Sequence, residues 1–245
     1  GPLPLRGYWS EIKCWRCFVG NISIFTQWQF FRLLIFNSNA DFHLQSKIFR
    51  TTVEPFSVLM SIYIKERATL LDRALRSILV DQTTKPSELV LVEDGPLTEE
   101  LYRVIDKYKS IFPSFISVKL PANVGLGRAL NAGLNRCRNE WVTRMDSDDI
   151  SLPTRFEKQL EYIRAHPDID VLGCALGEFE TDEHIVMSVK ACPASVDSYI
   201  KFRSPVNHPT VFFRKSSVLR AGSYQHCPFM EDYHLWIRMY AADMK

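Results

Sequence analysis

From Phe56 onward, apolar and polar positions follow a regular order along the chain. Residues 56–64 form a nearly continuous apolar run, which is typical of a strand buried on both faces of a sheet. Residues 67–80 then carry Leu and Ile at helical spacing, which predicts an amphipathic helix. The same order continues, and it predicts strands over Glu88–Glu93, Phe115–Leu120 and Glu140–Met145, and helices from Thr98, over Gly127–Cys137 and from Pro153 to about His166.

Alternating strands and helices predict an α/β fold with a mainly parallel, doubly wound sheet flanked by helices. Such sheets bind ligands in the crevice beyond the carboxyl ends of their strands. Polar residues follow each of the four predicted strands at this end. They are Tyr63 and Glu66, Asp94, Asn123-Val124-Gly125, and Asp146 with Asp148. Because four polar clusters converge on one edge of the sheet, we predict a functional site there.

The acidic run Asp146-Ser147-Asp148-Asp149 closes the fourth predicted strand. Like charges this close repel one another, and their burial without a partner is costly. A divalent cation removes the conflict, because Mg²⁺ is held by one or two carboxylates while substrate phosphates supply further oxygens. The run therefore favours an enzyme that handles a phosphorylated substrate through a metal. The alternative is a solvated acidic turn before a helix, since Asp is also an N-cap residue.

The glycine loop over residues 123–130 begins like a dinucleotide-binding fingerprint but fails it. The third glycine of G-x-G-x-x-G would fall at Leu130, and the loop follows the third strand rather than the first. The loop still allows the backbone to approach a ligand closely. Arg128, at the start of the next helix, is a candidate phosphate contact. The alternative is ordinary helix N-terminal chemistry with a solvated Arg.

Composition narrows the function classes. The chain has 245 residues, of which 46% are apolar and 24% charged, as in an ordinary soluble globular protein. A formal net charge of +2 gives no nucleic-acid footprint, so we expect no nucleic-acid partner. No stretch approaches the ~18 consecutive apolar residues of a membrane-spanning helix. The six cysteines are scattered, which favours a reducing compartment.

The two ends of the chain differ from its middle. Residues 1–54 show no sustained helical or strand period, and we expect an atypical extension that is poorly ordered or non-native. Within it, residues 27–36 offer an alternative, namely a short interfacial or partner-binding segment. Residues 55–245 form the predicted domain. A helix is predicted over Glu231–Met244, and Lys245 follows it at once, so we expect this domain to be truncated at its C-terminus.

Five motifs in a fixed order identify a family resemblance. They are Phe56-Ser-Val-Leu-Met-Ser-Ile-Tyr63, Leu91-Val-Glu-Asp94-Gly95, Asn123-Val-Gly125-Leu-Gly127, Arg144-Met-Asp146-Ser-Asp148-Asp149 and Met230-Glu231-Asp232-Tyr-His-Leu-Trp236. Together they resemble the family 2 glycosyltransferases of GT-A fold, a Rossmann-like nucleotide-binding architecture, and in particular the type that assembles bacterial polysaccharides and other cell-surface glycans. The resemblance covers roughly Pro55 to Lys245 and leaves residues 1–54 aside.

The resemblance implies a site for a nucleotide-sugar, with a UDP-sugar as the expected donor. Asp94 would accept a hydrogen bond from the uracil ring. Asp146 and Asp148 form the D-x-D signature, which would hold Mg²⁺ or Mn²⁺ against the diphosphate. His208 lies in a segment that commonly runs near the acceptor. Many relatives carry Asn after the Tyr, where this chain has Ile64. The implied donor-binding residues are Ser61, Tyr63, Glu66, Asp94, Asn123, Gly125, Arg128, Asp146, Ser147 and Asp148.

The pair Glu231-Asp232 supplies a candidate catalytic base. The resemblance assigns the base to Asp232, whereas position alone does not separate it from Glu231. Two adjacent carboxylates can raise one pKa toward a useful value. A base opposite the leaving group gives a single displacement, so the resemblance implies inverting transfer to a hydroxyl of a glycan or lipid-linked acceptor. From the residues alone, the alternative is a pair of carboxylates that favour the helix dipole.

The expected location is cytoplasmic, with peripheral association at the inner face of the cell membrane. One alternative is a nucleotidyltransferase, but the glycine-rich basic loop of that class is absent after the first strand, where residues 63–67 read Tyr-Ile-Lys-Glu-Arg. A second alternative is an inactive or binding-only fragment. The failed glycine fingerprint argues against an NAD-dependent oxidoreductase.

Overall fold

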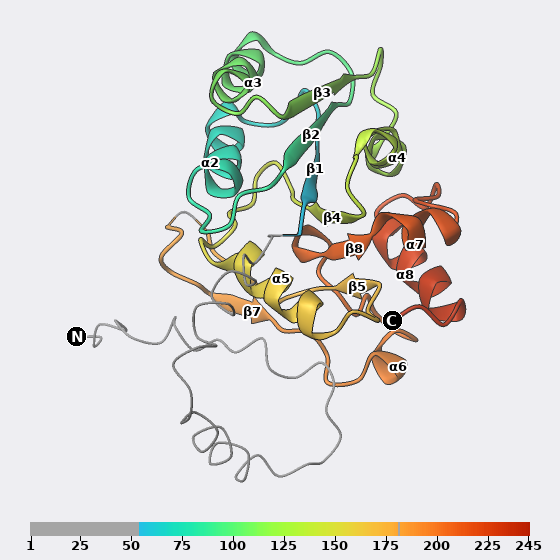
Figure 1. Cartoon of the computed structure of the whole chain (residues 1–245). Helices are drawn as coiled ribbons and strands as arrows, with labels where there is room; N and C mark the ends of the chain where they lie inside the picture. Colours follow the sequence, from blue (N-terminus) through green and yellow to red (C-terminus); the bar gives the residue numbers. More distant parts are fainter. Residues whose placement is uncertain (1–53, 181) are drawn as a thin grey trace, which may run out of the picture. The chain divides into compact units, whose positions relative to one another are not determined.

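The computed structural model describes residues 54–180 and 182–245 (Figure 1). The predicted extension over residues 1–54, including the segment 27–36, therefore lies outside the described residues, except for Glu54. Among the residues that are described, no helix combines the length and the apolar composition that crossing a bilayer requires.

A six-stranded sheet in the order β3-β2-β1-β4-β8-β5 forms the centre of the domain (Figure 1). Its first four strands are mutually parallel, whereas β8 pairs antiparallel with both β4 and β5. The predicted mainly parallel α/β sheet is thus confirmed. The strands are β1 (Phe56–Ile62), β2 (Glu88–Glu93), β3 (Phe115–Lys119), β4 (Trp141–Arg144), β5 (Val171–Leu172) and β8 (Phe212–Arg214).

Helices cover both faces of the sheet, because alternate residues of the central strand β1 supply two separate cores. Val58 and Met60 pack on one face with side chains of α2, α3 and α5. Leu59 packs on the other face with side chains of α4, α7 and α8. The helices are α2 (Ala68–Leu79), α3 (Glu99–Ile111), α4 (Leu126–Arg136), α5 (Arg155–Ala165), α6 (Val196–Tyr199), α7 (Lys215–Arg220) and α8 (Glu231–Ala241), with a 3₁₀ turn, η3, at His208–Thr210.

Helix α4 lies close to the sheet because a glycine faces the strands. A Cβ atom on Gly133 would lie 2.5 Å from Cδ1 of Leu59 and 2.6 Å from Cγ2 of Val92. A larger side chain at this position would push the helix outward or distort the core. The start of α4, which follows β3 at the carboxyl edge of the sheet, is thereby held at a fixed height above β1 and β2.

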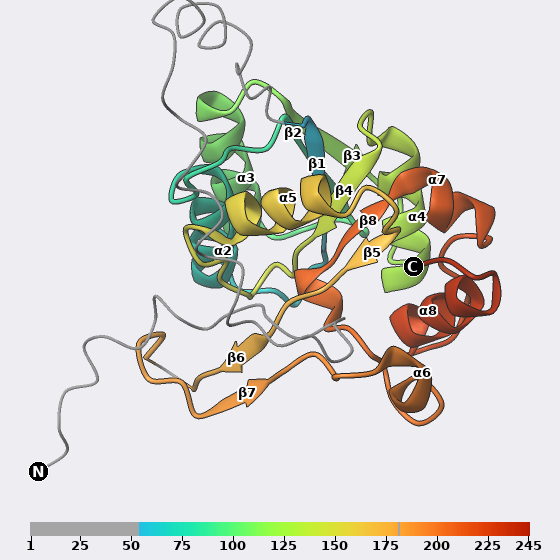
Figure 2. The same ribbon diagram turned by 60° about the horizontal axis from the view of Figure 1, so that its bottom comes forward.

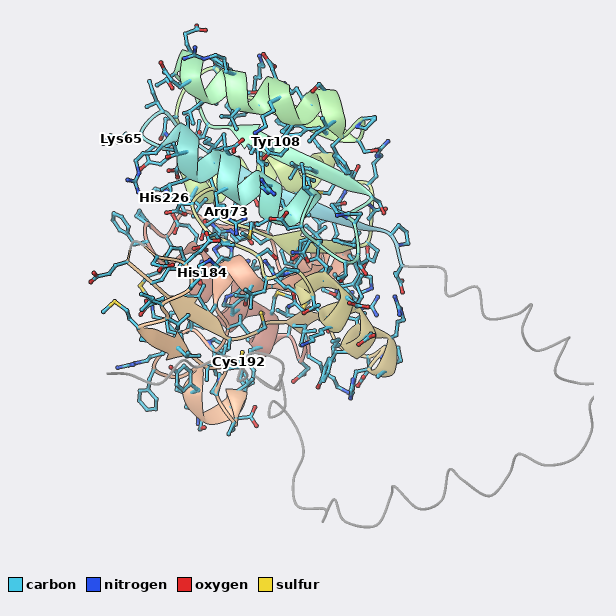
Figure 3. All side chains as sticks on the ribbon, turned by 90° about the vertical axis from the view of Figure 1, so that its left-hand side faces the viewer. Lys65, Arg73, Tyr108, His184, Cys192 and His226 are labelled. Atoms are coloured by element: carbon cyan, nitrogen blue, oxygen red, sulfur yellow. The ribbon has the colours of Figure 1, made fainter. Side chains whose placement is uncertain are left out.

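A separate two-stranded hairpin, β6 (Leu176–Glu178) with β7 (Ser188–Lys190), lies outside the six-stranded sheet (Figure 2). Its connecting loop is joined to α2 by two hydrogen bonds of 2.9 and 2.6 Å from Arg73 to the carboxylate of Glu183. Figure 3 labels Arg73 and His184, the neighbour of Glu183, on this side of the molecule. These short strands had no periodic signal in the sequence.

Candidate active site

The loops after β1 and β4 meet at the carboxyl edge of the sheet, as predicted. Ser147 Oγ donates a 2.8 Å hydrogen bond to Glu66 Oε2. Ser147 is buried, so this bond joins the acidic run to the loop after β1 over 81 residues of sequence. The same loop is closed by a 3.1 Å bond from the Glu66 N–H to the carbonyl of Tyr63. Two segments predicted to share a site are therefore in direct contact.

The loops after β2 and β3 meet through the buried carboxylate of Asp94. Its two oxygens accept hydrogen bonds from the N–H groups of Val124 (2.7 Å) and Gly125 (3.1 Å). Gly125 is the N-cap of α4 and has φ +87°, a conformation that favours glycine. Gly95 has φ +90°, and a Cβ there would lie 2.8 Å from the Asn123 nitrogen. Both glycines of the predicted motifs are thus required by the backbone.

A buried arginine stands beside the acidic run. Arg144 is the last residue of β4, its side chain is 3% exposed, and its Nη2 pairs with Oδ1 of Asp146. Its Nε and Nη1 atoms have no hydrogen-bond partner within residues 54–180 and 182–245. The Asp146 carboxylate, which is partly exposed, is therefore the nearest counter-charge for a guanidinium that is removed from water.

Electrostatic repulsion within the acidic run is visible in the pKa values. Burial raises the pKa of Asp148 above its ordinary value, and the charges of Asp146 and Glu66 raise it further. Burial and the charges of Asp146 and Asp148 raise the pKa of Asp149 to about 6. The fold thus concentrates negative charge at this point, and a cation would relieve it.

The acidic run fits a divalent cation of the kind that takes few protein ligands. The described part of the chain contains no group of three or more His, Cys, Asp or Glu side chains arranged to hold a metal. Mg²⁺ nevertheless needs only one or two carboxylates when waters and phosphates complete its coordination. Asp146 is partly exposed and Asp148 is exposed, and their charges repel each other, so these two residues suit that role.

An open cleft of about 460 Å³ brings the acidic run together with the start of α8. The starts of α4 and α8 are adjacent here, since a Cβ on Gly127 would lie 3.1 Å from Cγ of Glu231. The cleft thus places Asp146 within the same space as Glu231 and Asp232. The lining residues are Gly125, Leu126, Arg144, Asp146, His208, Pro228, Phe229, Glu231 and Asp232.

His208 lies in the floor of this cleft as a neutral side chain. It is 9% exposed, and burial lowers its pKa well below the ordinary value, with the positive charge of Arg144 acting in the same direction. One ring nitrogen, Nε2, is 2.9 Å from the hydroxyl of Tyr224. Tyr224 is held in turn by Asn131 of α4, whose side chain exchanges two hydrogen bonds with the Tyr224 backbone, at 2.7 and 3.0 Å.

The structure brings together most of the predicted site residues, in three contact groups. Glu66 and Ser147 form one, Asp94 with Asn123 and Gly125 forms another, and the cleft collects Gly125, Asp146, His208, Glu231 and Asp232. Ser61, Tyr63, Arg128 and Asp148 do not line the cleft, and Arg128 is exposed on α4. Sequence reasoning missed Arg144, Tyr224 and Phe229. A charged residue inside an apolar strand was the available signal for Arg144.

The family is shown by comparison with known proteins. Residues 57–227 match the family model described as glycosyl transferase family 2. The chain belongs to this family. The α/β domain described above is therefore a family 2 glycosyltransferase domain, and the predicted family is confirmed. The alternatives of a nucleotidyltransferase or an oxidoreductase are set aside.

Two relatives illustrate the similarity. The amylovoran biosynthesis glycosyltransferase AmsE of Erwinia amylovora is 47% identical over 187 residues, which cover 75% of this chain and 69% of the relative. A UDP-Gal:α-D-GlcNAc-diphosphoundecaprenol β-1,3-galactosyltransferase of Escherichia coli is 40% identical over 191 residues, covering 76% of this chain and 68% of the relative.

Solved structures support the fold. S. aureus TarS 1–349 in complex with UDP has a TM-score of 0.60 at 21% identity, and the match covers 76% of this chain and 55% of that one. The mannosyltransferase PcManGT from Pyrobaculum calidifontis, in complex with GDP-Man and Mn²⁺, has a TM-score of 0.58 at 17% identity, covering 77% and 52%. The chain thus spans about half of these structures, and the likeness at this identity shows the fold alone.

Proposed function

We propose that this domain transfers a sugar from a UDP-sugar to a hydroxyl group of a lipid-linked glycan, with inversion at the anomeric carbon and Asp232 as the general base. One observation carries the proposal. Asp146, of the acidic run, and Asp232, at the start of α8, line the same cleft. One cleft therefore holds a carboxylate that could bind a cation for the donor diphosphate and a carboxylate that could accept the proton of an attacking hydroxyl.

The proposed role of each carboxylate follows from the chemistry of the transfer. The acceptor oxygen forms the new bond to the anomeric carbon while the bond from that carbon to the diphosphate oxygen breaks. Asp232 takes the proton of the hydroxyl, for which it must come within hydrogen-bond reach, ~2.6–3.2 Å. Asp146 and Asp148 would hold Mg²⁺ or Mn²⁺, and this cation, when bound, would neutralise charge on the departing diphosphate.

The nucleotide side of the site is proposed at the edge formed by β1, β2 and β3. Asp94 already accepts two backbone N–H groups, but a carboxylate has about four acceptor positions. One of the roughly two remaining positions is assigned to the imide N–H of uracil. Ser61, Tyr63, Asn123 and Arg128 complete the proposed donor contacts, together with Glu66, Gly125 and Ser147. The donor in the name of the E. coli relative supports a uridine nucleotide.

The acceptor is proposed to enter on the side of His208 and Asp232. The substrate in the name of the E. coli relative is a sugar diphosphate on a lipid, which supports an acceptor of that class. Such an acceptor would place the enzyme at the cytoplasmic face of a membrane, associated peripherally. A role in polysaccharide assembly agrees with the name of AmsE.

The first experiment is calorimetric titration of UDP into the full chain, with and without Mn²⁺. We expect binding that depends on Mn²⁺, that is lost in Asp148→Ala and that persists in Asp106→Ala, a matched change of an exposed carboxylate on α3. Asp232→Asn should bind UDP like the wild type but lose transfer from UDP-sugars. Metal-independent binding would exclude the assigned metal role. UDP binding without transfer would favour the alternative of a binding-only fragment.

A further inference from the structure

The loop that leads into α8 contains a tight turn with an unusual third residue. The N–H of Met230 donates a 2.9 Å hydrogen bond to the carbonyl of Cys227, which closes a four-residue turn. Pro228 is the second residue of this turn, and Phe229 is the third, with φ +66°. Turns with Pro at the second position and a positive φ at the third normally carry Gly or Asn there. This chain carries a bulky aromatic residue instead.

The backbone conformation of Phe229 is strained by its side chain. Positive φ is uncommon outside glycine, and a bulky residue in this region is an outlier. Ser223 and Asp243, the other non-glycine residues with positive φ in the described ranges, are small and polar. Residues held in sparsely populated conformations cluster at binding and catalytic sites, because function maintains them against their cost.

Packing within the domain does not explain the aromatic ring. Phe229 is 98% exposed, so its ring contributes almost nothing to either hydrophobic core. A folded domain gains no burial energy from such a ring, and a glycine would suit the turn better. Phe229 nevertheless lines the cleft, together with its neighbour Pro228, and it precedes Asp232 by three residues. A ligand that enters the cleft would cover this ring and recover the burial energy that the fold itself does not gain.

We infer that Phe229 is the platform on which the sugar ring of the acceptor stacks. The inference rests on the proposed function, because it takes Asp232 as the base. The acceptor hydroxyl must reach this base, so the acceptor ring lies near the start of α8, whereas the donor diphosphate lies toward Asp146. The C–H face of a pyranose is apolar and matches the face of an aromatic ring. The closed turn fixes the backbone that carries this ring, and an aromatic side chain has few rotatable bonds, which keeps the entropic cost of stacking low.

The test compares acceptor kinetics and stability of Phe229→Gly with those of the wild type. Acceptors are monosaccharide diphosphates that carry either a short or a long alkyl chain, prepared with several different sugars. We expect the acceptor KM of Phe229→Gly to rise about five- to tenfold, since the acceptor sugar loses its contact with the aromatic face. The UDP affinity and kcat at saturating acceptor should stay within about twofold. The melting temperature should not fall, because glycine relieves the strained φ.

Two further variants control the test. Phe229→Tyr keeps an aromatic face and should retain the wild-type KM. Phe202→Ala removes another exposed aromatic ring, 81% exposed and away from the cleft-lining set, and should leave the KM unchanged. Calorimetric titration of the same acceptors, in the presence of UDP and Mn²⁺, reports the contact independently of turnover.

The outcomes separate the inference from the function on which it rests. An unchanged acceptor KM in an active Phe229→Gly variant overturns the stacking role alone. A loss of UDP affinity in this variant overturns the assignment to the acceptor and moves the ring to the donor. A loss seen only with long-chain lipid acceptors, and not with short-chain ones, shows that the ring contacts lipid and also overturns it. Absence of transfer in the wild type contradicts the proposed function itself.

Discussion

Ser147 and Glu66 are joined by a hydrogen bond of 2.8 Å from the Ser147 hydroxyl to the Glu66 carboxylate. The bond connects the loop after β1 to the middle of the acidic run. Ser147 is buried between the two aspartates that are proposed to face the metal. Its backbone, and with it the spacing of Asp146 and Asp148, is therefore held by a residue from another strand. Glu66 thus shapes the site without being part of the D-x-D sequence.

Removal of this bond should loosen the acidic run. Ser147→Ala leaves one carboxylate oxygen of Glu66 without its donor, and we expect a loss of about 1 kcal/mol in the free energy of unfolding. UDP affinity in the presence of Mn²⁺ should fall about tenfold, as for other residues that orient metal ligands. Urea unfolding and calorimetry measure the two effects. Ser110→Ala is the control, because within residues 54–180 and 182–245 the Ser110 hydroxyl bonds only to a carbonyl of α3. Equal effects of both variants would contradict the positioning role.

The sequence predicted the first half of the domain well, because long periodic elements dominate it. The strands β1 and β2 and the helices α2 and α3 were predicted within a few residues of their bounds. By contrast, β5 and β8 contain two and three residues, which is too short for any periodic signal. Their antiparallel pairing depends on contacts between distant segments. For the same reason the sequence could not show that the sheet becomes mixed beyond β4.

The sequence could locate candidate site residues that directly follow a strand, but not those that lie in irregular loops. Asp94 and Asp146 could be found because they come directly after apolar strands. The contact between His208 and Tyr224 joins two irregular loops, and nothing in their spacing indicates it. Phe229 looks like an ordinary apolar residue in the sequence, and its exposure and positive φ exist only in the folded chain.

Asp94 links the end of β2 to the start of α4, and its substitution should destabilise the domain. In Asp94→Asn one of the two acceptor oxygens becomes an amide N–H₂ group, which would face a backbone N–H of Val124 or Gly125. We expect the free energy of unfolding to fall by about 2 kcal/mol. This corresponds to a melting temperature that is lower by roughly 4–8 °C for a domain of this size. Differential scanning calorimetry measures it. Asp106→Asn, on the exposed face of α3, should shift the melting temperature by less than about 1 °C.

Two neighbouring aspartates should respond to neutralisation in opposite ways when no metal is present. Asp146→Asn removes the partner of the buried Arg144 guanidinium. We expect the free energy of unfolding to fall by about 1–3 kcal/mol. This is less than for a fully buried ion pair, because Asp146 is partly exposed. Asp148→Asn should instead leave stability unchanged or increase it. The raised pKa of Asp148, due to burial and to the charges of Asp146 and Glu66, shows that its negative charge is unfavourable in the folded domain.

Urea unfolding of both variants in EDTA measures this difference, and addition of Mn²⁺ with UDP provides the second arm. Neither variant should gain the ligand-dependent stabilisation that the wild type shows, since binding to the folded state alone raises stability. If Asp146→Asn were as stable as Asp148→Asn in EDTA, the ion pair with Arg144 would carry no weight in the metal-free domain.

The buried His208 should make stability depend on pH in a defined direction. Burial and the charge of Arg144 lower the pKa of His208 well below its ordinary value of 6.5. The folded domain therefore binds fewer protons at this position than the unfolded chain does. The stability that the neutral His208 side chain contributes is fully present above pH 6.5, and it is lost as the pH falls below this value. Between pH 6.5 and 5 the contribution amounts to about 2 kcal/mol at most.

His208→Gln, which cannot take up a proton, should abolish this part of the pH dependence. The difference in the free energy of unfolding between wild type and variant should thus shrink as the pH falls from 7 to 5. Urea titrations at each pH measure it, and the comparison removes contributions that both proteins share. His226→Gln is the matched control, because His226 is exposed. A difference that stays constant across the range would mean that the His208 ring takes up a proton as readily in the folded cleft as in the unfolded chain.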